Sequence, residues 1–162
     1  MALTKVQIGM TDAPTSGAAV TASGTSVDFN SIPATAKRIT VMFSGVSTSG
    51  SSIIQVQIGS GSVTTSGYTG AAVSNTTIAS YTAGIAIGAA GASGYLRNGA
   101  LIITNLSGNI YTALGNFGDS VNTVMSSTAS SVTLGGTLDR VRITTVNGTD
   151  TFDAGTINIM YE

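Results

Sequence analysis

The side chains that could support catalysis here are hydroxyls, carboxylates and guanidinium groups, because histidine and cysteine are both absent. Without histidine the commonest general base and metal ligand is missing. Without cysteine there is neither a thiolate nucleophile nor a disulfide framework. Serine and threonine are abundant, yet no Gly-x-Ser-x-Gly elbow accompanies a base and no Gly-Lys-Ser/Thr phosphate loop occurs. The sequence therefore predicts no catalytic residue, no cofactor and no metal site, and we expect a protein that is not an enzyme.

Carboxylates are few, and only two of them lie close together near a turn. The seven acidic residues are Asp12, Asp28, Asp119, Asp139, Asp150, Asp153 and Glu162. Asp150 and Asp153 follow Asn147-Gly148, a strong turn signal. We expect them to cap that turn or to form an ion pair with Arg140 or Arg142. A calcium or sodium site is a weaker alternative, because calcium usually needs more oxygen ligands than two carboxylates supply. A glycosidase acid pair is weaker still.

Arginine and tyrosine side chains are the candidates for binding a partner. Arg140 and Arg142 project from one face of an alternating run, where a solvated or ion-paired face is the favoured interpretation and a grip on an acidic glycan is the alternative. Tyrosine combines an apolar ring with a polar tip and can stack on sugars. Tyr68 and Tyr95 lie in glycine-flanked segments and are the better tyrosine candidates, although a core position is the commoner role for either. The candidate glycan or partner contacts are thus Tyr68, Tyr95, Arg140 and Arg142.

Low charge is the most unusual feature of the composition. Only 8% of the 162 residues are charged, against about 25% in an ordinary soluble domain. The net charge of −1 argues against nucleic acid or an anionic membrane as partner, since both require a clustered basic surface. The blandest stretch, residues 84–92, is far shorter than the ~20 apolar residues of a membrane span. A protein with so little self-repulsion is expected to bury apolar surface in an assembly.

Strands are the elements that must position these side chains. Three runs alternate apolar and polar residues, which is typical of half-buried strands: Lys37–Phe43, Ile54–Ile58 and Leu138–Val146. The first two are expected to form a hairpin or to be neighbours in one antiparallel sheet. In the third, Val141, Ile143 and Thr145 are expected to be buried, with Arg140, Arg142 and Thr144 exposed. A final strand is expected over 157–161.

The middle of the chain gives weaker signals. Residues 59–75 look loop-like, 78–87, 96–106 and 111–117 are expected to be strands, and 118–131 a polar connection. The fold class predicted is all-β, a β-sandwich of jelly-roll type with about 8–10 antiparallel strands. We divide the chain into an N-terminal arm, residues 1–24, and a β-sandwich domain, residues 25–162. Leu3, Val6 and Ile8 could add an edge strand, and the arm packs either on its own domain or on a neighbouring subunit.

Both ends of this domain resemble one family. The stretch Leu138–Glu162 is similar to the closing segment of many tailed-bacteriophage tail-fibre proteins, and so is Val27–Pro33 running into Lys37–Ser47. The resemblance covers roughly residues 26 to 162 and is poorest over 70–130. It implies a trimeric, host-facing domain at the end of a fibre. About 25 residues precede the matching part, where the family carries a long shaft, so a short fibre tip and a fibre-type domain reused on a capsid both stay open.

These observations predict a virion structural protein, located on the tail or the capsid surface. The first hypothesis is a tail-fibre or receptor-binding module that attaches to the host cell, with a host surface glycan as ligand. Capsid decoration, a cement protein that stabilises the shell, is the alternative, and a polysaccharide depolymerase is a weaker one. The partners expected are two further copies in a homotrimer and other virion proteins. Ala100–Ile103, apolar on both faces, and the small residues of 84–92 are expected to bring the copies together.

Overall fold

The computed structural model describes residues 13–119 and 121–162, and in this part the protein consists of β-strands joined by turns. A larger sheet has nine strands: β1 (Thr15–Ser16), β2 (Val20–Thr21), β4 (Arg38–Thr48), β7 (Thr69–Ser74), β8 (Thr77–Ser80), β10 (Arg97–Ser107), β11 (Ile110–Asp119), β12 (Val124–Thr133) and β14 (Phe152–Tyr161). A smaller sheet has five: β3 (Ser26–Asn30), β5 (Ile54–Ser60), β6 (Ser62–Val63), β9 (Ile85–Ala86) and β13 (Arg140–Thr145). All described strand pairs are antiparallel.

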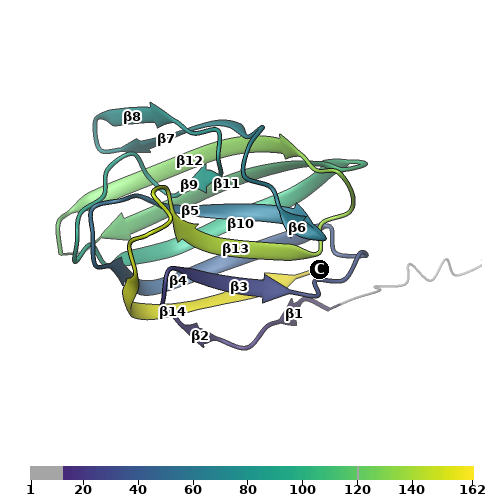
Figure 1. Ribbon diagram of the computed structural model, residues 1–162, viewed down its shortest axis with the longest axis horizontal. Coiled ribbons are helices and arrows are strands. Elements are labelled where there is room, and N and C mark those ends of the chain that lie inside the picture. The colour runs from purple at the N-terminus through teal and green to yellow at the C-terminus, as the bar shows by residue number, and fades with distance from the viewer. Residues whose placement is uncertain (1–12, 120) are drawn as a thin grey trace, which may run out of the picture.

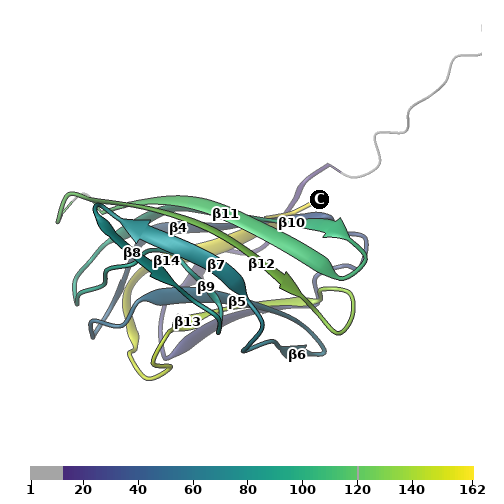
Figure 2. The same cartoon turned by 90° about the horizontal axis from the view of Figure 1, so that it is seen from above.

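The two sheets form two layers, as in a β-sandwich (Figure 2). In the larger sheet the order is β1-β14-β4-β10-β11-β12-β7-β8, with β2 also paired to β14, and in the smaller sheet it is β3-β13-β5-β6, with β9 on β5. The first and last long strands, β4 and β14, lie side by side (Figure 1). The predicted all-β class with antiparallel strands is confirmed. Ten described strands have four or more residues, and four have two.

The core lies between the layers and uses the inward residues of both. Val41 and Leu101 from the larger sheet and Val56 and Ile143 from the smaller one are completely buried. Phe43 adds an edge-to-face contact with Phe117, with ring centroids 5.5 Å apart. Burying each such side chain stabilises the fold by roughly 1.5–3 kcal/mol. The alternation in Lys37–Phe43, Ile54–Ile58 and Leu138–Val146 therefore correctly identified the core-facing residues.

One expected pairing is wrong. The run 37–43 belongs to β4 in the larger sheet, and the run 54–58 belongs to β5 in the smaller sheet, where its partner is β13. The chain crosses between the layers after Thr48, so the two runs face the same core from opposite sides. Alternation shows which residues are buried, but it does not distinguish a neighbour in the same sheet from a strand in the facing one.

The predicted polar connection over 118–131 is also wrong, because most of it is strand β12. Its inward positions include Ser126 and Thr128, which are buried although polar. The Ser126 hydroxyl lies 2.7 Å from the Ser74 hydroxyl, and the Thr128 hydroxyl donates to the Ala71 carbonyl at 3.3 Å. Hydrogen-bonded hydroxyls thus take positions where the prediction looked for apolar side chains. The loop-like interpretation of 59–75 likewise missed β6 and β7.

Thr144 and residues 84–88 lie deeper than expected. Thr144 was predicted to be exposed but is buried, and its hydroxyl donates to the Thr25 carbonyl at 2.9 Å. Residues 84–88 are all buried within the domain, where β9 pairs with β5. A methyl group on Gly88 would lie 2.7 Å from the Ser74 hydroxyl oxygen, so a small residue is needed there for packing inside this chain. These five residues are not available for contacts between copies.

The described part of the arm packs on its own domain. β1 and β2 both pair with β14, Ala22 is buried in the core, and Gly24 forms a bridge with Phe152. The strand expected around Leu3, Val6 and Ile8 falls outside the described residues. Within the described ranges there is no helix long and apolar enough to cross a membrane.

Candidate functional site

The outer face of the larger sheet carries two uncharged rows of side chains that cross six strands. Residues opposite one another in the ladder share a face, so the rows follow from the strand register. The first row contains Met160, Thr40, Ile102, Leu114, Ala129 and Ala71. The second contains Asn158, Met42, Ala100, Asn116, Ser127 and Val73. We call these twelve residues the outer stripe.

The outer stripe is uncharged, and eight of its twelve side chains are apolar. Leu114, at its centre, is 55% exposed, and Met42 and Ile102 are half-buried beside it. The nearest charge on β4 is Arg38, whose guanidinium forms an ion pair with Glu162. No lysine, arginine or acidic residue therefore interrupts the stripe. A contiguous apolar patch of this kind marks a contact surface more often than an ordinary solvent-facing one.

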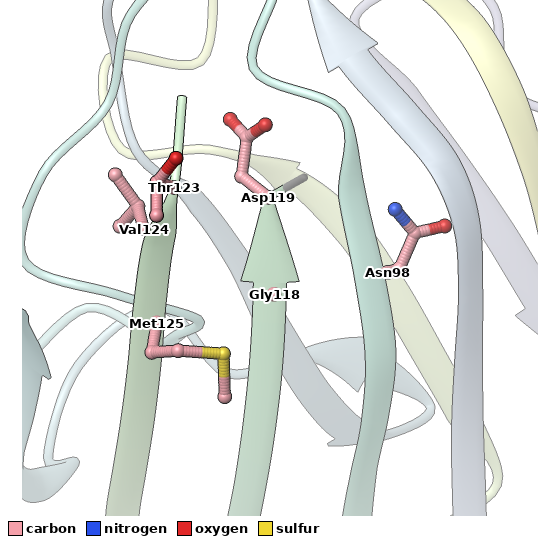
Figure 3. A pocket seen from close by; sticks show the side chains of 6 residues that line it. All are labelled: Asn98, Gly118, Asp119, Thr123, Val124 and Met125. Carbon is pink, nitrogen blue, oxygen red and sulfur yellow. The ribbon is translucent and has the colours of Figure 1, made fainter. Parts of the chain in front are cut away.

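A hollow of about 340 Å³ lies at one end of the same face. Its floor is Gly118, which lies between Asn98 on β10 and Met125 on β12 in the ladder. Figure 3 shows the Met125 side chain pointing from β12 towards β11, with Asn98 on the strand at the other side of β11. Met125 is 64% exposed, so its side chain forms an apolar wall open to solvent. The hollow suits an apolar side chain of a partner better than a charged ligand.

A buried arginine supports this end of the sheet from the inner side. Arg97 is 4% exposed, and its guanidinium donates to the Ala90 carbonyl at 2.5 Å and to the Ser126 hydroxyl at 3.3 Å. Burial lowers the pKa of Arg97 from its usual value, and the nearby Asp119 and Tyr95 oppose that shift. The Tyr95 ring lies 4.8 Å from the guanidinium carbon, a cation–π contact. Tyr95 is therefore half-buried against Arg97, with only part of its surface left for a sugar.

Asp119, opposite Arg97 in the ladder, is engaged by the turn that follows it. Its carboxylate accepts hydrogen bonds from the backbone N–H of Val121 at 2.9 Å and of Asn122 at 3.2 Å, and from the Asn122 side chain at 3.1 Å. A buried carboxylate held by three donors stabilises the local backbone. These three hydrogen bonds explain why the Asp119 carboxylate is buried.

Tyr68 is not a sugar-binding residue, and its selection as a candidate was wrong. It is 1% exposed, and its hydroxyl accepts a hydrogen bond from the Ile58 N–H at 2.8 Å and donates to the Thr64 carbonyl at 3.1 Å. Burial raises the pKa of Tyr68 to about 12, although the hydrogen bond from Ile58 acts in the opposite direction. The glycine-flanked sequence indicated a loop, but the ring fills the core beneath it.

The candidate arginines lie on β13, on the outer face of the smaller sheet, and both form ion pairs. Arg142 contacts Asp28 on β3 through hydrogen bonds of 2.7 and 3.1 Å, and Arg140 contacts the adjacent Asp139 at 2.7 Å. The hydrogen bond to Asp28 raises the pKa of Arg142, and that to Asp139 raises the pKa of Arg140. The ion-paired interpretation is confirmed, although Asp28 was not among the partners expected.

Asp150 has the turn-capping role expected, whereas Asp153 lies in strand β14 and does not cap the turn; both stand apart from the arginines. The Asp150 carboxylate accepts hydrogen bonds from the Asn147 side chain at 2.7 Å and the Ser52 N–H at 2.9 Å, and these bonds lower its pKa. Asp153 accepts a hydrogen bond from the Ser47 hydroxyl. No group of three or more acidic side chains suitable for a metal occurs within the described residues.

A polar hollow of about 380 Å³ accompanies Arg142 on the smaller sheet. Gln55, Gln57, Thr144 and Asn147 also line it. The Gln57 amide donates to the Ala83 carbonyl at 2.9 Å and the Gln55 amide to the Thr145 carbonyl at 3.3 Å, which fixes both side chains. The Gln55 amide oxygen is buried without a hydrogen-bond partner. Amides, hydroxyls and an arginine on rigid strands can recognise a hydroxyl-rich ligand.

Sequence reasoning identified Arg142 but missed Gln55, Gln57 and the outer stripe. The signal for the glutamines was present, because they alternate with Ile54, Val56 and Ile58 and must face away from the core. The stripe could not be found without the register, since its members come from six separate strands. Comparison with protein-family models, curated proteins and solved structures found no match to this chain.

Proposed function

We propose that this protein is a structural module of a bacteriophage particle, a tail-fibre or receptor-binding domain that attaches to the host cell surface as a homotrimer. The observation that carries the proposal is that the two sheets present surfaces of different character. The larger sheet presents the uncharged outer stripe, suited to contact between proteins, and the smaller sheet presents the polar hollow beside Arg142. One face for assembly and an opposite polar face for a glycan is the arrangement that an attachment module requires.

The resemblance to tail fibres supports this proposal, because the resembling segments lie next to one another in the fold. The resembling ends of the chain form β3, β4, β13 and β14. These are neighbours in pairs: β3 with β13 in the smaller sheet and β4 with β14 in the larger. The least similar part, residues 70–130, forms β8 to β11 and most of β7 and β12. A shared framework with a divergent remainder is expected where ligands or neighbours differ. Repeated crossing between layers also agrees with a jelly-roll-like path.

Capsid decoration is a second candidate, favoured by the breadth of the outer stripe. An uncharged surface across six strands would also suit a shell lattice. In that case the protein would sit on the virion capsid and contact no host glycan. Depolymerase activity receives no support from the carboxylates, since Asp28, Asp119, Asp139 and Asp150 hold separate hydrogen-bonded positions.

Localisation and adsorption together test the proposal. Cryo-electron microscopy of the parent particle, with the fold fitted to the map, is expected to place the protein on the tail. The purified protein is expected to adsorb saturably to host cells, and R142A is expected to weaken that adsorption at least several-fold. T133A, an exposed position on β12 of the larger sheet away from this hollow, is the matched variant that should bind nearly normally. Density on the shell lattice, or no adsorption at micromolar protein, would overturn the attachment role.

A further inference from the structure

The centre of the outer stripe is apolar in three neighbouring strands. Ile102 on β10, Leu114 on β11 and Ala129 on β12 are direct partners in the ladder, and Met160 continues the row on β14. Leu114 is more than half exposed, and Met125 at the nearby hollow is more so. In an antiparallel sheet with one wet face the outward positions are normally polar. Permanent exposure of these apolar side chains to water is therefore unfavourable.

The size of this face matches what a stable protein interface buries. The strands β14, β4, β10, β11 and β12 are consecutive in the sheet, and each has ten or eleven residues. With a strand spacing of ~4.8 Å and a rise of ~3.3 Å per residue, five such strands cover roughly 800 Å². Specific interfaces bury about 800 Å² on each partner. The whole outer face of these strands, of which the outer stripe is one part, is thus large enough for a complete interface.

The charge distribution favours another copy of this chain over a charged partner. The stripe itself has no charge, and Arg38 at its border is neutralised by Glu162 of the same chain. When two such faces meet, no unpaired charge is buried and no like charges are brought together. The pairs Arg142–Asp28 and Arg140–Asp139 lie on the smaller sheet, away from this contact. An acidic glycan or a nucleic acid would find no charged group to bind on the stripe.

We propose that the outer stripe is an interface between copies of this chain, with Leu114 near its centre. The inference deepens the proposed function, because it assigns a surface to the proposed homotrimer, and it rests on that function only for the number of copies. In the trimer the stripes of all three copies face the threefold axis, and the apolar side chains of each stripe pack against those of the other two. The smaller sheet and its polar hollow then face outward from the assembly.

Mass measurement tests the interface without any label. Multi-angle light scattering at micromolar protein is expected to give three times the monomer mass of 16.1 kDa. Twice that mass would support the interface and remove the trimer. L114K is expected to give 16.1 kDa with an unchanged far-ultraviolet circular dichroism spectrum. A129K, in the same row, is a second exposed variant with the same expectation. N30K, on the outer face of the smaller sheet, is the matched control and should leave the wild-type mass unchanged.

Disulfide trapping gives a second readout, because the chain has no cysteine of its own. L114C is expected to form interchain disulfides on mild oxidation, whereas N30C under the same conditions is expected to stay monomeric in non-reducing gels. A wild-type protein that stays at 16.1 kDa, or an oligomer that survives both L114K and A129K, would overturn this inference. Failure of host adsorption with an intact L114-dependent oligomer would instead overturn the attachment function alone.

Discussion

Arg142 on β13 and Asp28 on β3 are direct partners in the smaller sheet, and two parallel hydrogen bonds of 2.7 and 3.1 Å join the guanidinium to the carboxylate. Both side chains are about one-third exposed, at 39% and 32%. Two-point geometry gives such a pair more directional strength than a single contact has. Solvent nevertheless screens it, so its contribution to stability is small.

Replacing Asp28 tests whether the Arg142–Asp28 pair contributes little to stability. D28N keeps the shape of the side chain and removes its charge, and we expect the free energy of unfolding to fall by about 0.5 kcal/mol. Urea denaturation measures the change, and ~1 M NaCl should reduce the difference between wild type and variant. A loss that is large and insensitive to salt would show that the pair stabilises the fold by packing and not by charge.

Tyr68 is expected to matter much more to stability. In Y68F the Ile58 N–H loses its hydrogen-bond acceptor inside the core, and an unsatisfied buried donor costs about 1–3 kcal/mol. Urea denaturation should show this loss while the far-ultraviolet circular dichroism spectrum is unchanged. Y161F is the matched control, because Tyr161 is only partly buried. Equal stability of Y68F and wild type would contradict the hydrogen-bond assignment.

The raised pKa of Tyr68 also predicts a loss of stability in base. Burial disfavours the phenolate in the folded state, so the pKa is about 12 there and 10.0 when the chain unfolds. The contribution of the protonated group is fully present below pH 10.0 and is lost as the pH rises towards 12. Wild type should therefore lose stability faster than Y68F between pH 10.0 and about pH 12. Parallel pH dependences would contradict the shift.

Two glycines of the larger sheet are expected to respond in opposite ways to alanine. Gly155 has a φ of +91°, and a Cβ there would lie 2.4 Å from the Gly45 carbonyl oxygen, so G155A should destabilise the protein by at least about 2 kcal/mol. At Gly118 the nearest atom to a new Cβ is the Met125 sulfur, at 3.5 Å. G118A should change stability by less than about 1 kcal/mol. Thermal unfolding of both variants measures the contrast, and similar melting temperatures would contradict it.

Arg97 provides the last prediction. R97M replaces the buried guanidinium by an apolar chain of similar length and leaves the Ala90 carbonyl and the Tyr95 ring without their partner. We expect a loss of about 2 kcal/mol in the free energy of unfolding. R97K keeps the charge but not the two-directional hydrogen bonding, so it should lie between R97M and wild type. If R97M were as stable as wild type, the arginine would be dispensable for the sheet end beside the hollow.

The sequence was informative wherever apolar residues alternate with polar ones. The alternation of Ile39, Val41 and Phe43, and of Val141 and Ile143, correctly indicated strands and their buried sides. It failed at Ser126 and Thr128, where hydroxyls bond to neighbouring strands inside the sandwich, and a local pattern of serines and threonines has no hydrophobic period to detect.

The candidate site was harder to predict, because its members are assembled by register. Nothing in the sequence shows that Leu114 lies beside Ile102 and Ala129, since that depends on which strands pair and at which residue. Tyr68 failed for the opposite reason: its glycine and serine neighbours gave a correct local picture of a loop, but the ring reaches inward to Ile58. Arg142 was found because charge on the wet side of an alternating strand is a local property.

The side-by-side placement of β4 and β14 has a consequence for how the protein acquires its structure. Ser47 and Asp153, which are hydrogen-bonded across these strands, are 106 positions apart in sequence. Contacts of such separation must be made after long loops have closed, and domains dominated by them fold in milliseconds to seconds. During synthesis, the edge of β4 that pairs with β14 has no partner until β14 has left the ribosome. Slow folding with an open strand edge invites aggregation, so expression at low temperature or with a chaperone should raise the yield of native protein.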